Sequence, residues 1–539
     1  MNVLVLEAST TSAKAMVYSS DGEILRLEVA PFSAEVSEVT QQDTVGVYDQ
    51  LIQVGRKAAA GYEIAAIGLV GIWHSLLFTR FKRPLIKALT WANTNVPVTA
   101  SEYRNNPKLA EIHYRLSGCI PHASYPLYKL ISLNKQRNLA ATFNNKVLLS
   151  LYDPRVEIFG ISDFIFYQLT GVFGTSPNMA SGTSLLNVKT RQWDGLLLSR
   201  TGYRLDQLPT LYHHSQSFPL TEKAAAELGI QAGIPVTLPF ADGCMNQLGA
   251  NAFVPGIMTM SVGTSCAIRT IAERLPKFPV EAGLWCYQGL DNYLVGAATS
   301  GGTNCVEWFR NLFAPDMSLK ALDASVDIAH KRPVFLPFIY GERAPGWQAY
   351  SRGGFFADGI FLDSDSLEDE VKRNALVARY GIPALYTSVL EGILMTVLQC
   401  FKQLTAVVYT HTINLSGGIL YSPVWRQMAA DILQRELAMP SSEQASTLGG
   451  ARMALQAIDP VKYPIKPKIK TTPTASEGSQ GMGRTTPIVN HLHLSTIRPT
   501  LVKVSEPDQV IHPDPLRREH YEQRFNTYLE AYAATHQQG

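Results

Sequence analysis

The chain has few of the features that mark several large protein classes. Its 539 residues include only six cysteines, which lie far apart and form no C-x-x-C pair. Neither a zinc site nor a dense disulfide frame is supported, and we expect free thiols in a reducing cytoplasm. The longest apolar run, from Ile64 to Phe78, is too short to span a bilayer, and the first residues carry neither a basic region nor a small-residue cleavage site. We therefore expect no membrane span and no secretory signal.

An excess of one charge is also lacking. The 47 basic and 45 acidic residues leave a net charge of +2. Such a balance creates no field that would attract nucleic acid or an anionic membrane, so we expect neither partner. The motifs G-x-x-x-x-G-K-[ST], G-x-G-x-x-G, H-E-x-x-H and G-x-S-x-G are missing as well. Their absence removes P-loop, Rossmann, zincin and α/β-hydrolase sites as leading interpretations.

What is present is one kind of turn used twice. Residues Ser9, Thr10, Thr11 and Ser12 lie between the apolar strands expected at 3–7 and 14–18. Gly263, Thr264 and Ser265 lie between strands expected at 257–262 and 266–269. Such turns direct backbone N–H groups and hydroxyls into one concavity, which suits the oxygens of a phosphate. Two of them facing each other predict a cleft for a polyphosphate and hence nucleotide-dependent phosphoryl transfer.

The order of the expected elements also repeats. Strands at 3–7, 14–18 and 24–29 form a meander, followed by a helix at 45–60 and a strand at 66–72; Ser162 is expected to cap a later helix that Gly171 ends. A second meander begins near Gly256 and is followed by helices at 385–404 and 423–433. The length favours two to four domains. We predict an N-terminal domain at 1–253, a C-terminal domain at 254–461, a Pro/Thr/Gly-rich loop at 462–510 and a docking amphipathic helix at 511–539.

Asp242 is the strongest catalytic candidate. It follows an apolar strand directly, where a carboxylate can project into a crevice and accept the proton of a sugar hydroxyl during phosphoryl transfer. An Asp-Gly turn without chemistry is the alternative. Glu7, at the end of the first strand, is placed to hold magnesium through water, or is a surface carboxylate. Lys14 either contacts a phosphate or is an exposed hairpin lysine.

Other segments suit a ligand without requiring one. Gly301-Gly302 and Gly417-Gly418 each follow a strand and permit close backbone approach, although singly each is an ordinary turn. Trp73-His74 and Trp91-Ala92-Asn93 offer the aromatic and hydrogen-bonding groups of polyol sites, although such a histidine is more often a core residue. We expect Glu342 and Arg343 to form an ion pair that braces a loop.

Taken together, these segments resemble the FGGY carbohydrate kinases, within them the gluconokinase-like branch. The resemblance spans nearly the whole chain and rests on the order and spacing of many short motifs, among them Trp73-His74-Ser75, Trp91-Ala92-Asn93-Thr94, Asp242-Gly243, Gly263-Thr264-Ser265, Gly341-Glu342-Arg343-Ala344-Pro345 and Ser416-Gly417-Gly418. It implies an α/β fold of two actin-like, ribonuclease-H-like domains, with ATP and Mg²⁺ in the cleft between them and the sugar deep in the first.

The resemblance also implies roles for single residues. Asp242 matches the catalytic base, and it is assigned with Glu7 to the metal. The first phosphate loop comprises Ser9, Thr10, Thr11, Ser12 and Lys14, the second Gly263, Thr264 and Ser265, with Gly302, Gly417 and Gly418 on the nucleotide side. Trp73, His74 and Asn93 fall with Asp242 where the sugar is held. The implied partners are a small sugar or sugar acid and ATP, with a homodimer left open.

Three departures from the family pattern stand out. The usual Asp-x-Gly-Thr of the first loop is Glu7-Ala8-Ser9-Thr10 here, so a longer carboxylate and an added side chain meet the phosphate. Asn93 and Asn95 replace the usual Asp and Arg, and Pro239 replaces a glycine before the aspartate. The leading hypothesis is an ATP-dependent kinase of a sugar, sugar acid or polyol, gluconate-like or pentulose-like. The alternative is a catalytically silent relative that binds sugar or nucleotide in a regulatory role.

Overall fold

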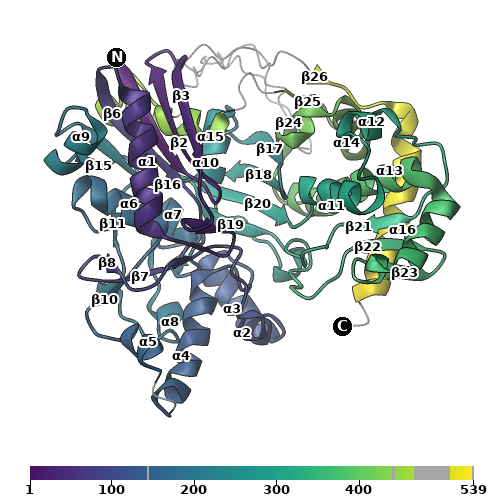
Figure 1. The fold of residues 1–539 in the computed structure, drawn as a ribbon, viewed down its shortest axis with the longest axis horizontal. Coiled ribbons are helices and arrows are strands. Elements are labelled where there is room, and N and C mark those ends of the chain that lie inside the picture. The colour runs from purple at the N-terminus through teal and green to yellow at the C-terminus, as the bar shows by residue number, and fades with distance from the viewer. Residues whose placement is uncertain (143–144, 440–443, 466–509, 537–539) are drawn as a thin grey trace, which may run out of the picture.

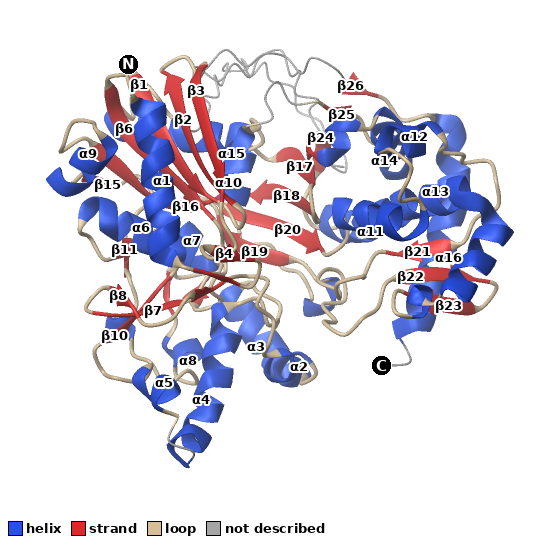
Figure 2. Ribbon diagram, viewed as in Figure 1, coloured by secondary structure: helices blue, strands red, loops and turns tan. Residues whose placement is uncertain are grey.

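The computed structural model describes residues 1–142, 145–439, 444–465 and 510–536. Two mixed β-sheets lie side by side, each flanked by helices (Figures 1 and 2). The predicted loop at 462–510 lies almost entirely outside the described residues, and the domain boundaries stay a prediction.

The first sheet has the strand order β15-β16-β6-β1-β2-β3. Strands β1, β2 and β3 form the predicted antiparallel meander, while β6 and β16 run parallel to β1. The bounds are β1 (Asn2–Ala8), β2 (Ser12–Ser19), β3 (Ile24–Pro31), β6 (Ile64–Gly71), β15 (Ser217–Pro219) and β16 (Pro235–Ala241). Strand β1 is buried over Val3–Ala8, which explains why it reads as a continuous apolar run.

The second sheet repeats this arrangement. Its order is β19-β20-β18-β17-β24-β25-β26, with β17, β18 and β20 antiparallel and β24 and β25 parallel to β17. The bounds are β17 (Gly256–Val262), β18 (Cys266–Ala272), β19 (Trp285–Gln288), β20 (Tyr293–Thr299), β24 (Thr410–Gly417), β25 (Leu437–Ala438) and β26 (Val510–Ile511). The predicted restart of the first-half architecture is confirmed. Each phosphate-type turn joins the central strand of its sheet to the antiparallel neighbour.

Helices cover both faces of the first sheet. Helix α1 (Thr44–Ala59) packs on β1, β2 and β3, and α6 (Ile161–Thr170) on β6 and β16. Helix α6 ends at Gly171, with φ 72°, as predicted, but its N-cap is Gly160, and Ser162 lies inside the first turn. The predicted serine cap is therefore wrong, because the Asp163 carboxylate already accepts the Gly160 N–H at 2.7 Å.

The opposite face is covered by a helix from the far end of the chain. Helix α15 (Ala445–Ile458) packs against α10 (Asp242–Gly249) and against β6, β1 and β16, so it lies among the first-sheet elements (Figure 1). Glycines allow this close approach: a Cβ at Gly249 would overlap the Ala445 carbonyl, and one at Gly449 the Met245 carbonyl.

Helix α13 (Glu370–Thr405) packs against β18 and β20 of the second sheet and α14 (Pro423–Leu433) against β26, while α11 (Thr303–Phe313) and α16 (Arg518–His536) pack against α13. Among helices in the described ranges, α13 alone is long and apolar enough to cross a membrane, and 83% of its most apolar stretch is buried in the fold, as in a core helix. Helix α16 buries Tyr521, Phe525 and Tyr528 and lies along α13 and α14.

The remaining elements extend both halves, with α12 and β21 to β23 in the second. They are β4 (Ser37–Glu38), β5 (Gln41–Gln42), β7 (Leu77–Arg80), β8 (Arg83–Pro84), β9 (Ala88–Leu89), α2 (Pro97–Arg104), α3 (Pro107–Ser117), α4 (Pro126–Thr142), α5 (Lys146–Ser150), β10 (Val156–Phe159), β11 (Gly174–Thr175), α7 (Pro177–Ser181), β12 (Leu186–Asn187), β13 (Gln192–Trp193), α8 (Gly195–Leu198), β14 (Thr210–Leu211), α9 (Glu222–Leu228), α12 (Leu319–Ala324), β21 (Val334–Leu336), β22 (Gly354–Ala357) and β23 (Ile360–Asp363).

Candidate active site

Asp242 is the first residue of α10, directly after β16. Its Oδ1 accepts the Gly243 N–H at 2.6 Å, and its side chain is open to solvent. Desolvation by the surrounding protein raises the pKa of Asp242, Arg269 lowers it and Glu7 raises it further. A carboxylate with a raised pKa at a strand end has the properties of a general base.

Arg269 on β18 faces this aspartate from the other sheet. A side chain at Gly243 would meet both the Arg269 guanidinium and the Trp73 ring, so all three lie beside Asp242. Burial lowers the pKa of Arg269 and Asp242 raises it, and its Nε has no hydrogen-bond partner among the described residues. The cation therefore lies where negative charge on a reacting group would be stabilised.

The first phosphate-type turn is closed by its own side chain. The Ser9 Oγ accepts the N–H groups of Thr11 at 3.1 Å and Ser12 at 2.9 Å, and it lies 3.0 Å from the Ser12 carbonyl. Two of the N–H groups expected to face a phosphate are thus already bonded. The Thr10 Oγ1 accepts the indole N–H of Trp91 at 3.1 Å. The added serine side chain has a direct structural effect at the position where the family pattern has glycine.

Glu7 and Lys14 lie opposite each other in the β1–β2 register and form an ion pair of 3.0 Å. The Glu7 Oε1 also accepts the Ser446 hydroxyl of α15 at 2.7 Å, and the Lys14 Nζ donates to the Gln444 Oε1 at 3.2 Å. The structure therefore gives both residues protein partners. Their assignments to metal and phosphate stay predictions.

The second turn is open. Gly263 donates its N–H to the Ser265 carbonyl at 3.1 Å, whereas no protein acceptor within the described residues takes the N–H of Thr264 or Ser265. The first two N–H groups of α11 bind the carbonyls of the turn: Thr303 donates to the Gly263 carbonyl and Asn304 donates to the Thr264 carbonyl. This turn has donors available for a phosphate.

The predicted glycines gather around the second turn. A Cβ at Gly302 would overlap the Gly263 carbonyl, and one at Gly417, which has φ 85°, would overlap the Val262 carbonyl. A Cβ at Gly418 would press on the Thr303 side chain. The structure therefore brings residues from β17, β24 and α11 together, and backbone packing requires glycine at positions 302 and 417.

A chain of contacts joins the two turns. The Arg343 guanidinium donates to the Ser265 Oγ at 3.0 Å and to the Thr299 carbonyl at 2.8 Å, and it lies 5.4 Å above the Trp91 ring. Trp91 in turn bonds Thr10. Glu342 points elsewhere and receives the Gly346 N–H and the Tyr532 hydroxyl. The predicted Glu342–Arg343 ion pair is wrong because the two side chains extend to different partners.

The predicted sugar residues lie beside these groups. The Trp73 indole donates to the Asn178 carbonyl at 3.0 Å, and His74, with φ 66°, bonds the Gly182 carbonyl through Nδ1. Burial lowers the pKa of His74 to about 3, with smaller effects from the Gly182 bond and nearby cations, so its ring is neutral. Asn93 is half-buried and bonds the Thr90 carbonyl through its backbone.

Sequence reasoning missed a set of buried cations next to His74. Lys129 of α4 is 1% exposed, donates to the Ser124 carbonyl at 2.5 Å and has its pKa lowered by burial to about 7. Burial lowers the pKa of His122 well below its usual value, and Arg343, Arg104 and Lys129 lower it further. Within the described part of the chain, no ion pair includes Lys129, Arg269 or Arg343. A lone lysine in the apolar run 127–131 was the available signal.

Comparisons with known proteins cover most of the chain. The N-terminal domain of the FGGY family of carbohydrate kinases matches residues 2–249, and its C-terminal domain matches residues 258–458. The gluconokinase of Bacillus subtilis is 26% identical over 481 residues, which cover 84% of this chain and 87% of that protein. The xylulose kinase of the same organism is 22% identical over 477 residues, covering 84% and 87%.

Solved structures show the same fold. The gluconate kinase of Lactobacillus acidophilus superposes with a TM-score of 0.79 at 25% identity, covering 99% of this chain and 98% of that one. The ligand-bound xylulose kinase of that organism gives 0.80 at 24% identity, with the same coverage. The predicted two-domain α/β fold is confirmed, and this chain belongs to the FGGY family of carbohydrate kinases.

Proposed function

We propose that this carbohydrate kinase transfers the γ-phosphate of ATP to a hydroxyl of a sugar or sugar acid, with Asp242 as the general base. The observation that carries the proposal is the position of Asp242: it opens α10, is accessible to solvent, has a raised pKa and faces Arg269 of the second sheet. With Oδ1 bonded to Gly243, Oδ2 is the atom that takes the hydroxyl proton. The hydroxyl oxygen then attacks the γ-phosphorus, and ADP leaves.

The second turn would hold the phosphates of ATP through the free N–H groups of Thr264 and Ser265. Arg269 would balance negative charge near the reacting oxygen. Glu7 is close enough to Asp242 to raise the pKa of Asp242. Two neighbouring carboxylates supply the oxygen ligands that Mg²⁺ prefers. When bound, Mg²⁺ would neutralise phosphate charge there.

The charges favour a sugar acid over a neutral sugar. Lys129 and Arg343 act on both His74 and His122, and Arg104 acts on His122. An anionic carboxylate would neutralise these cations, which have no ion-pair partner among the residues that the structure describes. Relatives include proteins named gluconokinase, which fits an acid substrate. The cytoplasm, where six buried free cysteines stay reduced, is the proposed compartment.

The test is an ADP-release assay with gluconate, xylulose, ribulose and glycerol, beside Asp242→Ala. General base removal should lower kcat about 10²- to 10⁴-fold while ATP binding is kept. Absence of ADP release above that variant with every substrate, despite ATP binding, would favour the silent alternative, which no comparison supports.

A second variant tests the acid substrate separately. Lys129→Met should raise KM for gluconate and leave KM for xylulose unchanged, whereas Lys135→Met, on the exposed side of the same helix, should change neither. Because a protonated Lys129 holds the anion, KM for gluconate should rise as the pH passes above about 7. If the protein phosphorylates only neutral sugars, the proposed sugar-acid substrate is wrong and the proposed kinase activity still holds.

A further inference from the structure

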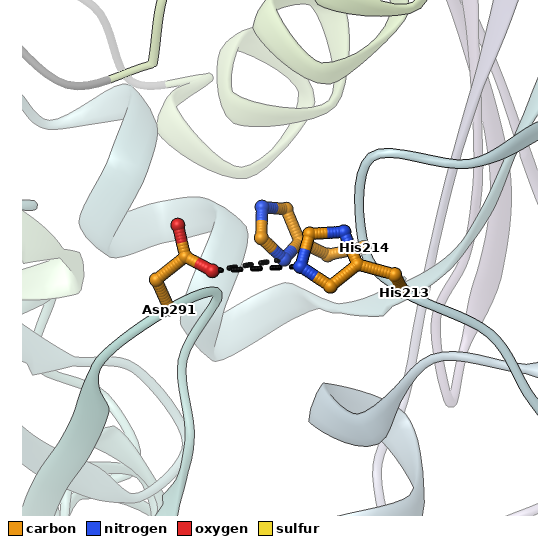
Figure 3. Close-up of side chains that lie close together, drawn as sticks. All are labelled: His213, His214 and Asp291. Carbon is orange, nitrogen blue, oxygen red and sulfur yellow. Dashed lines mark ion pairs between the residues drawn. The ribbon is translucent and has the colours of Figure 1, made fainter.

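Two histidines and an aspartate meet at the surface where the two halves of the chain touch. His213 and His214 lie in the loop between β14 and β15, within the N-terminal family match. Asp291 lies in the turn between β19 and β20, within the C-terminal match. Figure 3 shows both imidazoles directed at the Asp291 carboxylate.

The distances suit a shared cation. The Asp291 Oδ1 lies 3.6 Å from the His213 Nε2 and 3.7 Å from the His214 Nδ1, and one donor atom from each residue lies within 4.8 Å of the other two. A tetrahedral ion with ligands at about 2.0–2.1 Å places them about 3.4 Å apart. The two distances to Asp291 are within a few tenths of an ångström of this value, and the imidazole nitrogens lie no more than 4.8 Å apart. Imidazole nitrogens with one carboxylate oxygen are ligands of Zn²⁺ and its neighbours rather than of Mg²⁺.

The surroundings hold these groups in place. The Ser215 Oγ contacts the His213 Nδ1 at 2.8 Å, on the side of the ring away from Asp291. Arg191 donates to the Asp291 carbonyl at 2.7 Å, which fixes the turn. The His214 side chain is 10% exposed, whereas His213 and Asp291 are 59% and 43% exposed. Three protein ligands with one open side leave a fourth position for water.

We propose that His213, His214 and Asp291 bind one divalent transition metal ion, preferably Zn²⁺, that ties the β14–β15 loop to the β19–β20 turn. The ion would be structural, because it would hold one loop of each half together. It would reinforce a contact that Asn178 already makes by donating to the Gln288 carbonyl at 2.6 Å. The proposal does not depend on the substrate or on the proposed catalytic role of Asp242.

The experiment uses the full chain without an affinity tag, stripped with a chelator and titrated with Co²⁺ and then Zn²⁺. We expect one Co²⁺ per chain, with the visible absorption of a four-coordinate site that Zn²⁺ abolishes, and a rise in the unfolding temperature with Zn²⁺. His214→Ala and Asp291→Ala should each weaken binding at least 100-fold and abolish the absorption band.

Two controls separate this site from background binding. His330→Ala removes an exposed histidine that pairs with Asp327 and should leave Co²⁺ binding unchanged. A double His491→Ala, His493→Ala variant should do the same, because the proposed ligands are His213, His214 and Asp291 alone. Unchanged Co²⁺ binding in His214→Ala, or none by the wild-type chain at micromolar Co²⁺, would overturn the proposal in favour of simple His–Asp contacts.

Discussion

Ser9→Gly should tighten nucleotide binding. The Ser9 Oγ occupies the N–H groups of Thr11 and Ser12, so a phosphate that uses them must displace both bonds. Each of these hydrogen bonds contributes a net free energy of about 0.5–1.5 kcal/mol, so displacing both costs about 1–3 kcal/mol. Removing the hydroxyl should therefore lower Kd for ATP and ADP by about 5- to 150-fold.

The assay is calorimetric titration of ATP and ADP without sugar, using Ser9→Gly and Ser9→Ala. Ser19→Ala is the matched control, because the Ser19 Oγ accepts the Asp21 and Glu23 N–H groups in the turn at the other end of β2. All three variants lose comparable hydrogen bonds, so urea unfolding should show similar losses of stability, with an added glycine cost of about 0.5–1 kcal/mol. Unchanged or weaker nucleotide binding by both Ser9 variants would refute the reasoning.

Three further variants test other parts of the fold. Arg269→Gln should raise the pKa of Asp242 further, because Arg269 lowers it, so the acid limb of the kcat profile should move to higher pH; an unmoved limb contradicts this. Gly302→Ala should raise KM for ATP and cost about 1–3 kcal/mol in urea unfolding, because its Cβ would overlap the Gly263 carbonyl. Glu391→Gln should cost about 3–5 kcal/mol, because it leaves the buried Arg332 and the half-buried Arg524 without their carboxylate. Burial would raise the pKa of Glu391, but these arginines hold it below its usual value. The stability that Glu391 gains from the two arginines is therefore present at neutral pH and lost as the pH falls through that lowered pKa. Urea unfolding of the wild-type chain at neutral pH and at acidic pH would show this loss.

The repeated meanders were predictable because local signals define them. Apolar runs on either side of a hydroxyl-rich turn predicted strands β1, β2, β17 and β18. The position of Asp242 directly after an apolar run predicted that it lies at the carboxyl end of a strand. The pairing of Glu7 with Lys14 follows from the hairpin register, since these residues are opposite. Such features depend on neighbours within a few residues.

The rest depends on contacts between distant segments. The use of the Ser9 hydroxyl is set by the backbone of its turn, which residue types alone do not specify. Arg269 meets Asp242, and Asp291 meets His213, only after two sheets have packed together. An apolar face on α15 indicates burial, yet nothing in its periodicity tells which sheet receives it. Charges and helices separated by long stretches of chain are therefore assigned by packing.

The position of α15 bears on how the chain is made. Its residues 445–458 complete the face of a sheet that begins at residue 2, and they support the helix that starts with Asp242. During synthesis, the first sheet must wait with an apolar face uncovered until more than two hundred further residues have left the ribosome. An isolated fragment ending near residue 253 should aggregate, and supplying the 445–458 segment as a peptide should relieve it. The first sheet is thus completed late, by a helix that follows every strand of the second sheet except β26.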